Sequence, residues 1–148
     1  MAIRDDLKKT LVESAKARDQ VLLDTVRGIQ SAVRYKEIEK MGVLADAEIL
    51  QVISGLCKQR RESIEQYQNA KRMDLVEKET RELKILQTFL PEQLSTDAIR
   101  TEVEKIIKSL DAKGPADMGR VIKEAMKVFA GRADGKTVSE TVKSLLVP

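Results

Sequence analysis

The stretch FLPEQLS, residues 89–95, divides this chain of 148 residues into two parts. A proline disfavours helical conformation in the residue before it, so a helix that approaches from the N-terminal side must stop at Pro91. The hydroxyl residues at 95 and 96 can each accept a hydrogen bond from the first turn of a following helix and so begin it. The stretch therefore predicts two domains, residues 1–91 and residues 92–148.

On the N-terminal side of this boundary, apolar residues recur at helical spacing. The pattern predicts about four helices joined by short links, which favours antiparallel packing of neighbours. The second helix can be capped by Asp19 and stopped at Gly42, and the third can be capped by Asp46. The residues that set the pattern of the first two helices are Ile3, Leu7, Leu11, Ala15, Leu22, Val26, Ile29 and Val33.

On the C-terminal side, the chain is long enough for three short helices. The first is predicted to end at Gly114-Pro115, a further one starts at Asp117, and Asp134 can cap the last. No segment alternates with the period of a β-strand. The sequence therefore predicts an all-α protein, with a small three-helix tail domain that has little core of its own.

The composition limits the kind of partner that this chain can bind. The 27 basic residues are nearly balanced by 24 acidic residues, for a formal net charge of +3. Any nucleic-acid binding must therefore come from local clusters of cations. Aromatic residues make up 3% of the chain and tryptophan is absent, which argues against a surface that stacks single-stranded bases.

The compartment is predicted from what the sequence lacks. A single cysteine, Cys57, cannot form an internal disulfide and does not indicate an oxidising compartment. No apolar run reaches the roughly 18 residues that a membrane helix needs. The first residues carry charge and helical periodicity in place of a signal-peptide pattern. We therefore expect a cytoplasmic protein with no membrane partner.

The sequence shows no catalytic constellation. The chain has no histidine, which removes the commonest general base near neutral pH and the commonest neutral metal ligand. Cys57 follows Ile53 by one helical turn, so it is expected in the core, without a base to activate it. We therefore predict no catalytic residue, no metal and no cofactor. Enzyme activity is left undecided, with a non-catalytic role favoured.

Cations cluster in three places along the chain. In the first cluster, Lys58 and Arg61 lie one helical turn apart and can point the same way. Arg60 lies between them, and Glu62 and Glu65 are close enough to neutralise the group. The second cluster comprises Arg27, Arg34 and Lys36. For both clusters an ordinary solvated helix surface is the favoured interpretation.

The third cluster lies in the tail and is the strongest candidate binding site. Two glycines bracket a short loop, GRADG, which delivers Arg132 and Lys136 to the start of the last helix. The start of a helix presents free backbone N–H groups and a partial positive charge, so two nearby cations make a phosphate-binding corner. Arg120 and Lys123 lie on the preceding helix and extend the cluster, together with Lys127.

Several of these segments together resemble the YqeY family over essentially the full length of the chain. The resemblance is most specific in LPEQLS and in GRADGK, and single segments would be weaker. The segments that carry it are Leu23–Arg27, Lys58–Ser63, Glu79–Leu86, Phe89–Ser95, Met118–Val121 and Gly131–Lys136.

The YqeY family is similar to the C-terminal part of the B subunit of the tRNA-dependent amidotransferase and to modules of some glutaminyl-tRNA synthetases. The resemblance implies two helical units and a tRNA-binding accessory role. Its predicted contacts are Arg120, Lys123, Arg132 and Lys136 in the tail, with Lys58 and Arg61 as a second contact.

Two alternatives remain open beside tRNA binding. The first is docking on an aminoacyl-tRNA synthetase or amidotransferase subunit through a stripe made of Met118, Val121, Met126 and Phe129, for which a core role is the competing interpretation. The second, less favoured, is a part in a carbon–nitrogen ligase activity with glutamine as amido-nitrogen donor, for which Cys57 would be the candidate nucleophile.

Overall fold

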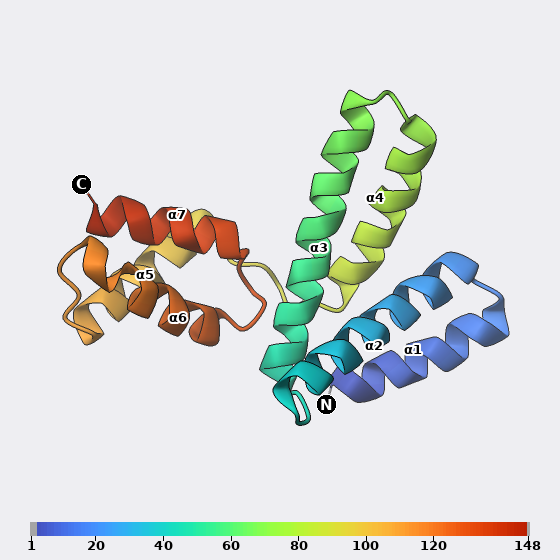
Figure 1. Cartoon of the computed structure of the whole chain (residues 1–148), viewed down its shortest axis with the longest axis horizontal. Helices are drawn as coiled ribbons and strands as arrows, with labels where there is room; N and C mark the ends of the chain where they lie inside the picture. The colour runs from blue at the N-terminus through green and yellow to red at the C-terminus, as the bar shows by residue number, and fades with distance from the viewer. Residues whose placement is uncertain (1–2, 148) are drawn as a thin grey trace. The chain divides into compact units, whose positions relative to one another are not determined.

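A computed structural model describes residues 3–147 of the chain, and within that range it contains helices and no β-strand. The predicted all-α class is confirmed. The chain divides between Leu90 and Pro91 into two compact units, each of which is described here by itself. The α-helices of the first unit are α1 (Ile3–Ala17), α2 (Gln20–Lys40), α3 (Asp46–Asn69) and α4 (Met73–Thr88) (Figure 1). Those of the second are α5 (Thr96–Ser109), α6 (Met118–Phe129) and α7 (Gly135–Leu146), with a 3-10 turn, η1 (Pro115–Asp117), before α6.

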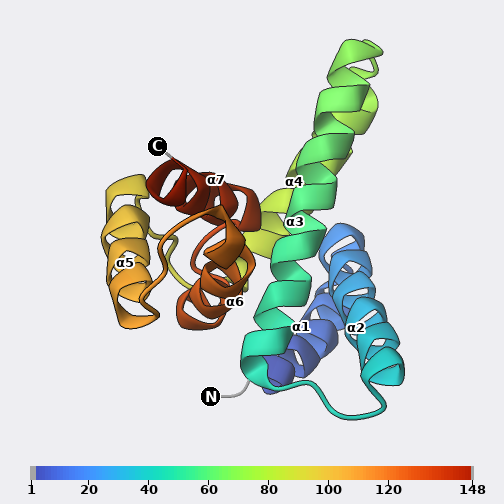
Figure 2. The same ribbon diagram turned by 60° about the vertical axis from the view of Figure 1, so that its left-hand side comes forward.

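The first unit consists of two helical hairpins. Helices α1 and α2 lie side by side, as do α3 and α4, and Figures 1 and 2 show both pairs. The apolar stripes of these helices meet in one core, to which α3 contributes the buried side chains of Ile49, Ile53 and Cys57, and α4 that of Leu86. The core lies at the end of the α3–α4 hairpin near Leu44, and the tip of that hairpin at residues 69–73 extends beyond it.

An ion-pair cluster joins α3 to α4 where the apolar core ends. The Arg60 guanidinium Nε lies 3.0 Å from a carboxylate oxygen of Glu82 and 3.4 Å from one of Glu79. The two glutamate side chains are only about 15% exposed and share this one guanidinium as a counter-charge, although neither Arg60 Nε nor Glu79 Oε2 has a hydrogen-bond partner. The Arg60 side chain therefore links α3 to α4.

Of the N-caps predicted in the first unit, Asp19 is found at the expected position and that of α3 lies one residue earlier. The Asp19 carboxylate accepts a hydrogen bond from the backbone N–H of Leu22 at 3.2 Å, as an N-cap should. Helix α3 is capped at Ala45, one residue before the predicted Asp46. Ala45 has no polar side chain to accept a bond from the first turn, and Glu48 makes the other bond of a capping box by accepting from the Ala45 N–H at 3.1 Å.

The end of α2 differs from the prediction. The left-handed residue that ends the helix is Met41, with φ of 58°, and Gly42 follows it. A non-glycine residue in this conformation carries a strain of roughly 1 kcal/mol. The N–H of Gly42 donates to the carbonyl of Glu37 at 3.1 Å, which closes the helix end and directs the chain toward Leu44 and the core.

The second unit has a core of its own. Helix α5 begins as predicted, because the Ser95 hydroxyl accepts from the Ala98 N–H at 3.1 Å. The three helices bury one apolar cluster, in which Val103 of α5, Val121 of α6 and Val142 of α7 are completely inaccessible to solvent. The proposed docking stripe on α6 is therefore wrong as an exposed surface: Val121 and Phe129 are buried, and Met118 and Met126 pack against the same cluster.

Candidate nucleic-acid interface

The loop between α6 and α7, residues 130–134, is held in place by hydrogen bonds from residues 93 and 94 to its backbone carbonyls. Ala130 and Gly131 take consecutive positive φ angles of 43° and 83°, and this turns the chain sharply after α6. The Gly131 carbonyl accepts from the Gln93 side-chain amide at 2.8 Å. The Arg132 carbonyl accepts from the Leu94 N–H, also at 2.8 Å. The segment after Pro91 thus anchors the loop to the second unit.

Burial of its neighbours forces Arg132 outward. Gly131 and Ala133 on either side of it are buried, and Ala133 is part of the core. Arg132 itself is exposed, and its Nε lies 3.4 Å from the Glu92 carbonyl, a long hydrogen bond that leaves most of the guanidinium free to bind another group. The fixed backbone therefore presents a cation with little conformational freedom at its base.

The start of α7 lies directly after this cation. Asp134 occupies the N-cap position, but its carboxylate accepts no backbone hydrogen bond from the helix. It accepts instead from the Thr137 hydroxyl at 3.4 Å. The prediction that Asp134 caps α7 is correct for position and wrong for the bond. The first N–H groups of α7 are accordingly not capped by this side chain, and Lys136 is exposed in the same turn.

The cations on α6 fall into two groups. Arg120 and Lys123 lie in the first half of the helix, roughly 9–14 Å of helix rise from its end at Phe129. Both are exposed, and Arg120 donates to the Asp117 carboxylate at 3.1 Å. The structure thus does not bring these two to the loop. Lys127, in the last turn of α6, is nearer to Arg132 in the chain and extends the loop cluster along the helix.

The charge of the second unit is unevenly distributed. Residues 118–148 contain six basic and three acidic side chains, whereas residues 92–112 contain three basic and five acidic ones. The α6–α7 hairpin is therefore the cationic side of a nearly neutral unit. This asymmetry was readable from the sequence and gives the hairpin the local field that net charge alone does not show.

The cations of the first cluster on α3 differ in whether they form ion pairs. Lys58 and Arg61 are exposed on α3, and within residues 3–147 no ion pair within 4.0 Å joins either of them to Glu62 or Glu65. The sequence grouped Arg60 with them, but Arg60 pairs with α4 as described above. Its partners lie on another helix, so local spacing gave no signal for them. Lys58 and Arg61 stay available for an external anion.

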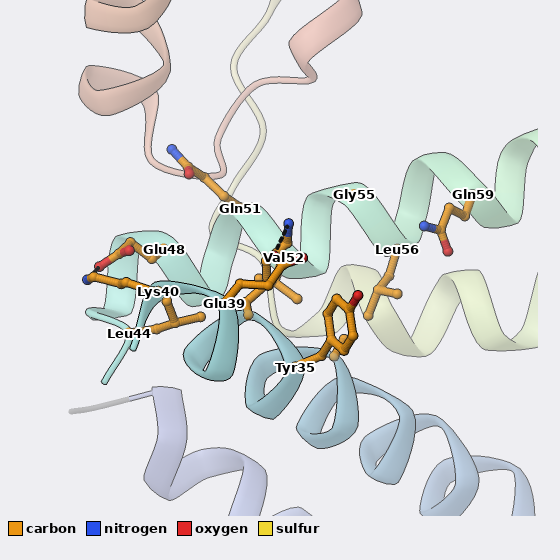
Figure 3. Close-up of a pocket in the computed structure, with 12 residues that line it drawn as sticks. Tyr35, Glu39, Lys40, Leu44, Glu48, Gln51, Val52, Gly55, Leu56 and Gln59 are labelled. Carbon is orange, nitrogen blue, oxygen red and sulfur yellow. Dashed lines mark hydrogen bonds and ion pairs between the residues drawn. The ribbon is translucent and has the colours of Figure 1, made fainter. Parts of the chain in front are cut away.

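A groove runs between α2 and α3 in the first unit, with a volume of about 850 Å³. Figure 3 shows Val52 and Leu56 of α3 and Tyr35 of α2 along it, with the amides of Gln51 and Gln59 on the α3 side. At the end nearest Leu44, Lys40 and Glu48 form an ion pair of 2.7 Å, drawn as a dashed line. No pattern in the sequence predicts this groove, because it depends on how far two helices diverge.

The single cysteine lies in the core of the first unit. Cys57 is 1% exposed, and burial raises the pKa of its thiol, which disfavours the reactive thiolate. Among the residues that the structure describes, no three metal-ligating side chains of the His, Cys, Asp and Glu types come together. No described helix is both long and apolar enough to cross a membrane.

Comparison with known proteins identifies the family. A family model described as Yqey-like protein matches residues 4–146. The chain belongs to the YqeY family. The resemblance expected from the sequence motifs is thereby confirmed over nearly the whole chain.

Curated fungal relatives have the same family relationship. The protein named Altered inheritance of mitochondria protein 41, mitochondrial, of Kluyveromyces lactis is 33% identical over 147 residues, which cover 97% of this chain and 73% of the relative. The protein of that name in Vanderwaltozyma polyspora is 36% identical, covering 72% of this chain and 60% of the relative. The one in Pyrenophora tritici-repentis is 28% identical, covering 95% and 78%. These relatives are named as mitochondrial proteins, so the predicted cytoplasmic location of this chain stays a prediction.

Proposed function

We propose that this chain is a non-catalytic tRNA-binding module, which contacts the phosphate backbone through the loop and helix start at residues 131–136. The observation that supports it most is the outward position of Arg132 on a fixed loop, beside a helix start that no aspartate side chain caps. Backbone N–H groups and a neighbouring cation are the donors that a phosphate oxygen accepts from.

The other predicted contacts have secondary roles in this proposal. Lys136 and Lys127 add charge around Arg132, and Arg120 and Lys123 continue the cationic face along α6. Lys58 and Arg61 form a second contact on the first unit. With few aromatic side chains, the module would recognise the shape and backbone of folded RNA and not its bases. The family's similarity to the tRNA-contacting part of the amidotransferase B subunit favours tRNA as the RNA.

A titration with variants tests this proposal. Binding of labelled tRNA and of a duplex DNA comparator is measured by fluorescence anisotropy at several salt concentrations. The double variant Arg132→Ala with Lys136→Ala is expected to weaken tRNA binding about tenfold or more and to reduce the slope of log affinity against log salt by roughly 2. Circular dichroism and thermal melting establish that the variant is folded.

A matched control removes the same charge elsewhere in the same unit. The double variant Lys105→Ala with Lys108→Ala changes two exposed lysines of α5 and leaves the net charge equal to that of the test variant. We expect its tRNA affinity to remain within about twofold of the unchanged protein. Unchanged affinity in the Arg132–Lys136 variant, or equal losses in both variants, would refute the assignment of the site.

A second candidate function is docking on a helix of an aminoacyl-tRNA synthetase or amidotransferase subunit. The groove between α2 and α3 favours it, and exposed apolar side chains lie in the last turn of α2 and just after it: Ile38 is 70% exposed, Met41 92% and Val43 74%. Binding of a purified subunit that persists after nuclease treatment and is lost in Leu56→Glu would favour this role. Loss of the same complex on nuclease treatment would favour tRNA binding.

A further inference from the structure

A small pocket with an excess of positive charge lies between α1 and α2 of the first unit, beside the start of α3. Its volume is about 190 Å³. The buried side chains of Leu7, Val33 and Ile49 line it on the core side. This pocket lies in a different unit from the tail loop and shares no residue with the proposed tRNA contacts.

Three cations from two helices line the pocket. Arg4 and Lys8 lie one turn apart on α1, and Arg34 lies on α2, one turn after Gln30. The sequence grouped Arg34 with other cations of its own helix. The fold instead places it opposite two cations of α1, a pairing that the spacing along α2 could not reveal.

The single carboxylate that lines the pocket, that of Glu37, already accepts two hydrogen bonds. Glu37 Oε2 accepts from Arg4 Nη2 at 2.9 Å and from the Leu44 N–H at 2.9 Å. Within residues 3–147, no carboxylate lies within 4.0 Å of the charged groups of Lys8 or Arg34. Neither Lys8 nor Arg34 therefore has a directly paired carboxylate, and Glu37 attracts Arg34 only over a longer range.

An anion placed between Lys8 and Arg34 would be a direct counter-charge for both. Charge-assisted bonds from Arg and Lys to an oxyanion are among the stronger hydrogen bonds in proteins, and Gln30 offers an additional amide donor. The volume decides the size of the anion. Clefts for drug-sized ligands measure roughly 300–1,000 Å³, so about 190 Å³ is too small for a nucleotide and sufficient for one phosphate group with a few waters.

We propose that this pocket binds a phosphate group, free or as the terminal group of a small monoester, with Arg34 and Lys8 as its principal ligands and Gln30 as a third donor. Arg4 borders the site and stays bound to Glu37. Because the ligands come from both α1 and α2, the bound group joins the two helices of the N-terminal hairpin.

Calorimetric titration of the full chain with inorganic phosphate tests the proposal, in a buffer without phosphate or sulfate and at constant ionic strength. The unchanged protein is expected to bind one phosphate per chain with saturation. Lys8→Gln and Arg34→Gln are each expected to weaken binding about tenfold, the loss of one charged hydrogen bond. Phosphate should also raise the melting temperature above that in matched chloride, and should do so less in these variants.

Matched controls lie on the same two helices. Lys9→Gln and Arg27→Gln remove the same charges from exposed positions that do not line the pocket, and both should retain the affinity of the unchanged protein. The Arg132→Ala, Lys136→Ala variant should also bind phosphate normally, which separates this site from the proposed tRNA contact. Absence of saturable binding, or equal losses in test and control variants, would overturn the proposal.

Three small ligands distinguish the source of the group. Inorganic phosphate and glycerol phosphate that bind with similar affinity would assign the pocket to a terminal phosphate, and a tenfold preference for inorganic phosphate would assign it to the free ion. Dimethyl phosphate carries one charge and models a nucleic-acid backbone. If it binds best, the pocket is a contact for polynucleotide and our proposal is wrong.

Discussion

At the scale of single residues, Glu37 connects more of the first unit than any local pattern indicates. Its carboxylate joins α2 to Arg4 of α1 and to the backbone of Leu44, which packs into the core. The N–H bond from Leu44 and then the bond from Arg4 hold the pKa of Glu37 below its ordinary value of 4.5. One ionised side chain therefore helps to fix where α3 begins.

The lowered pKa of Glu37 predicts how stability depends on pH. The stabilisation is fully present above pH 4.5, the ordinary value, and is lost as the pH falls through the lower pKa of the folded state. In Glu37→Gln, we expect the free energy of unfolding in urea to fall less steeply below about pH 4.5 than in the unchanged protein. Glu39→Gln, an exposed change on the same helix, should keep the steeper fall. Parallel pH curves for all three proteins would contradict this.

Residue roles were predictable from sequence where they depend on near neighbours in the chain. The exposure of Arg132 and Lys136 followed from the loop pattern, and the burial of Cys57 followed from its spacing to Ile53. The role of Arg60 could not be predicted, because its carboxylate partners lie on the following helix. The position of Arg34 in the same pocket as Arg4 and Lys8 of α1 could not be predicted either, because those residues also lie on another helix.

At the scale of helices, the apolar periodicity defined the cores of the elements and left their ends less certain. Ser95 and Asp19 cap helices as predicted because their side-chain oxygens do so locally. The end of α2 at Met41 was assigned to the glycine that follows it. At the end of α6 both Ala130 and the glycine after it take positive φ, whereas at the end of α2 the non-glycine residue Met41 does so.

Two glycines of this chain predict opposite stability changes, because one lies inside a helix and the other has a positive φ angle. Gly55 lies inside α3, and a Cβ added there would meet no atom within 4 Å. Gly55→Ala is therefore expected to stabilise the protein by about 0.5–1 kcal/mol in urea unfolding. Gly131, with φ of 83°, is a matched contrast, and Gly131→Ala should destabilise by about 1–2 kcal/mol. A loss of stability in Gly55→Ala would contradict the open space seen at that position.

At the scale of the whole molecule, the separate cores predict that damage to one unit stays in that unit. Val103→Ala removes completely buried volume from the second unit and should destabilise it by about 2 kcal/mol, which lowers the protection of α5–α7 amides from hydrogen exchange roughly thirtyfold. Protection of α3 is expected to stay unchanged. The converse change, Ile53→Ala, should affect only the first unit. Equal loss of protection in both units would show that they unfold as one.

The left-handed helix ends have a consequence for how this protein can evolve. Within residues 3–147, five non-glycine residues take positive φ at helix ends, namely Arg18, Met41, Lys71, Asp111 and Ala130. At each of them, replacement by glycine relieves strain without altering a core side chain. The stability of this protein can therefore change through substitutions at the ends of its helices, while the buried cores and the proposed binding residues keep their side chains.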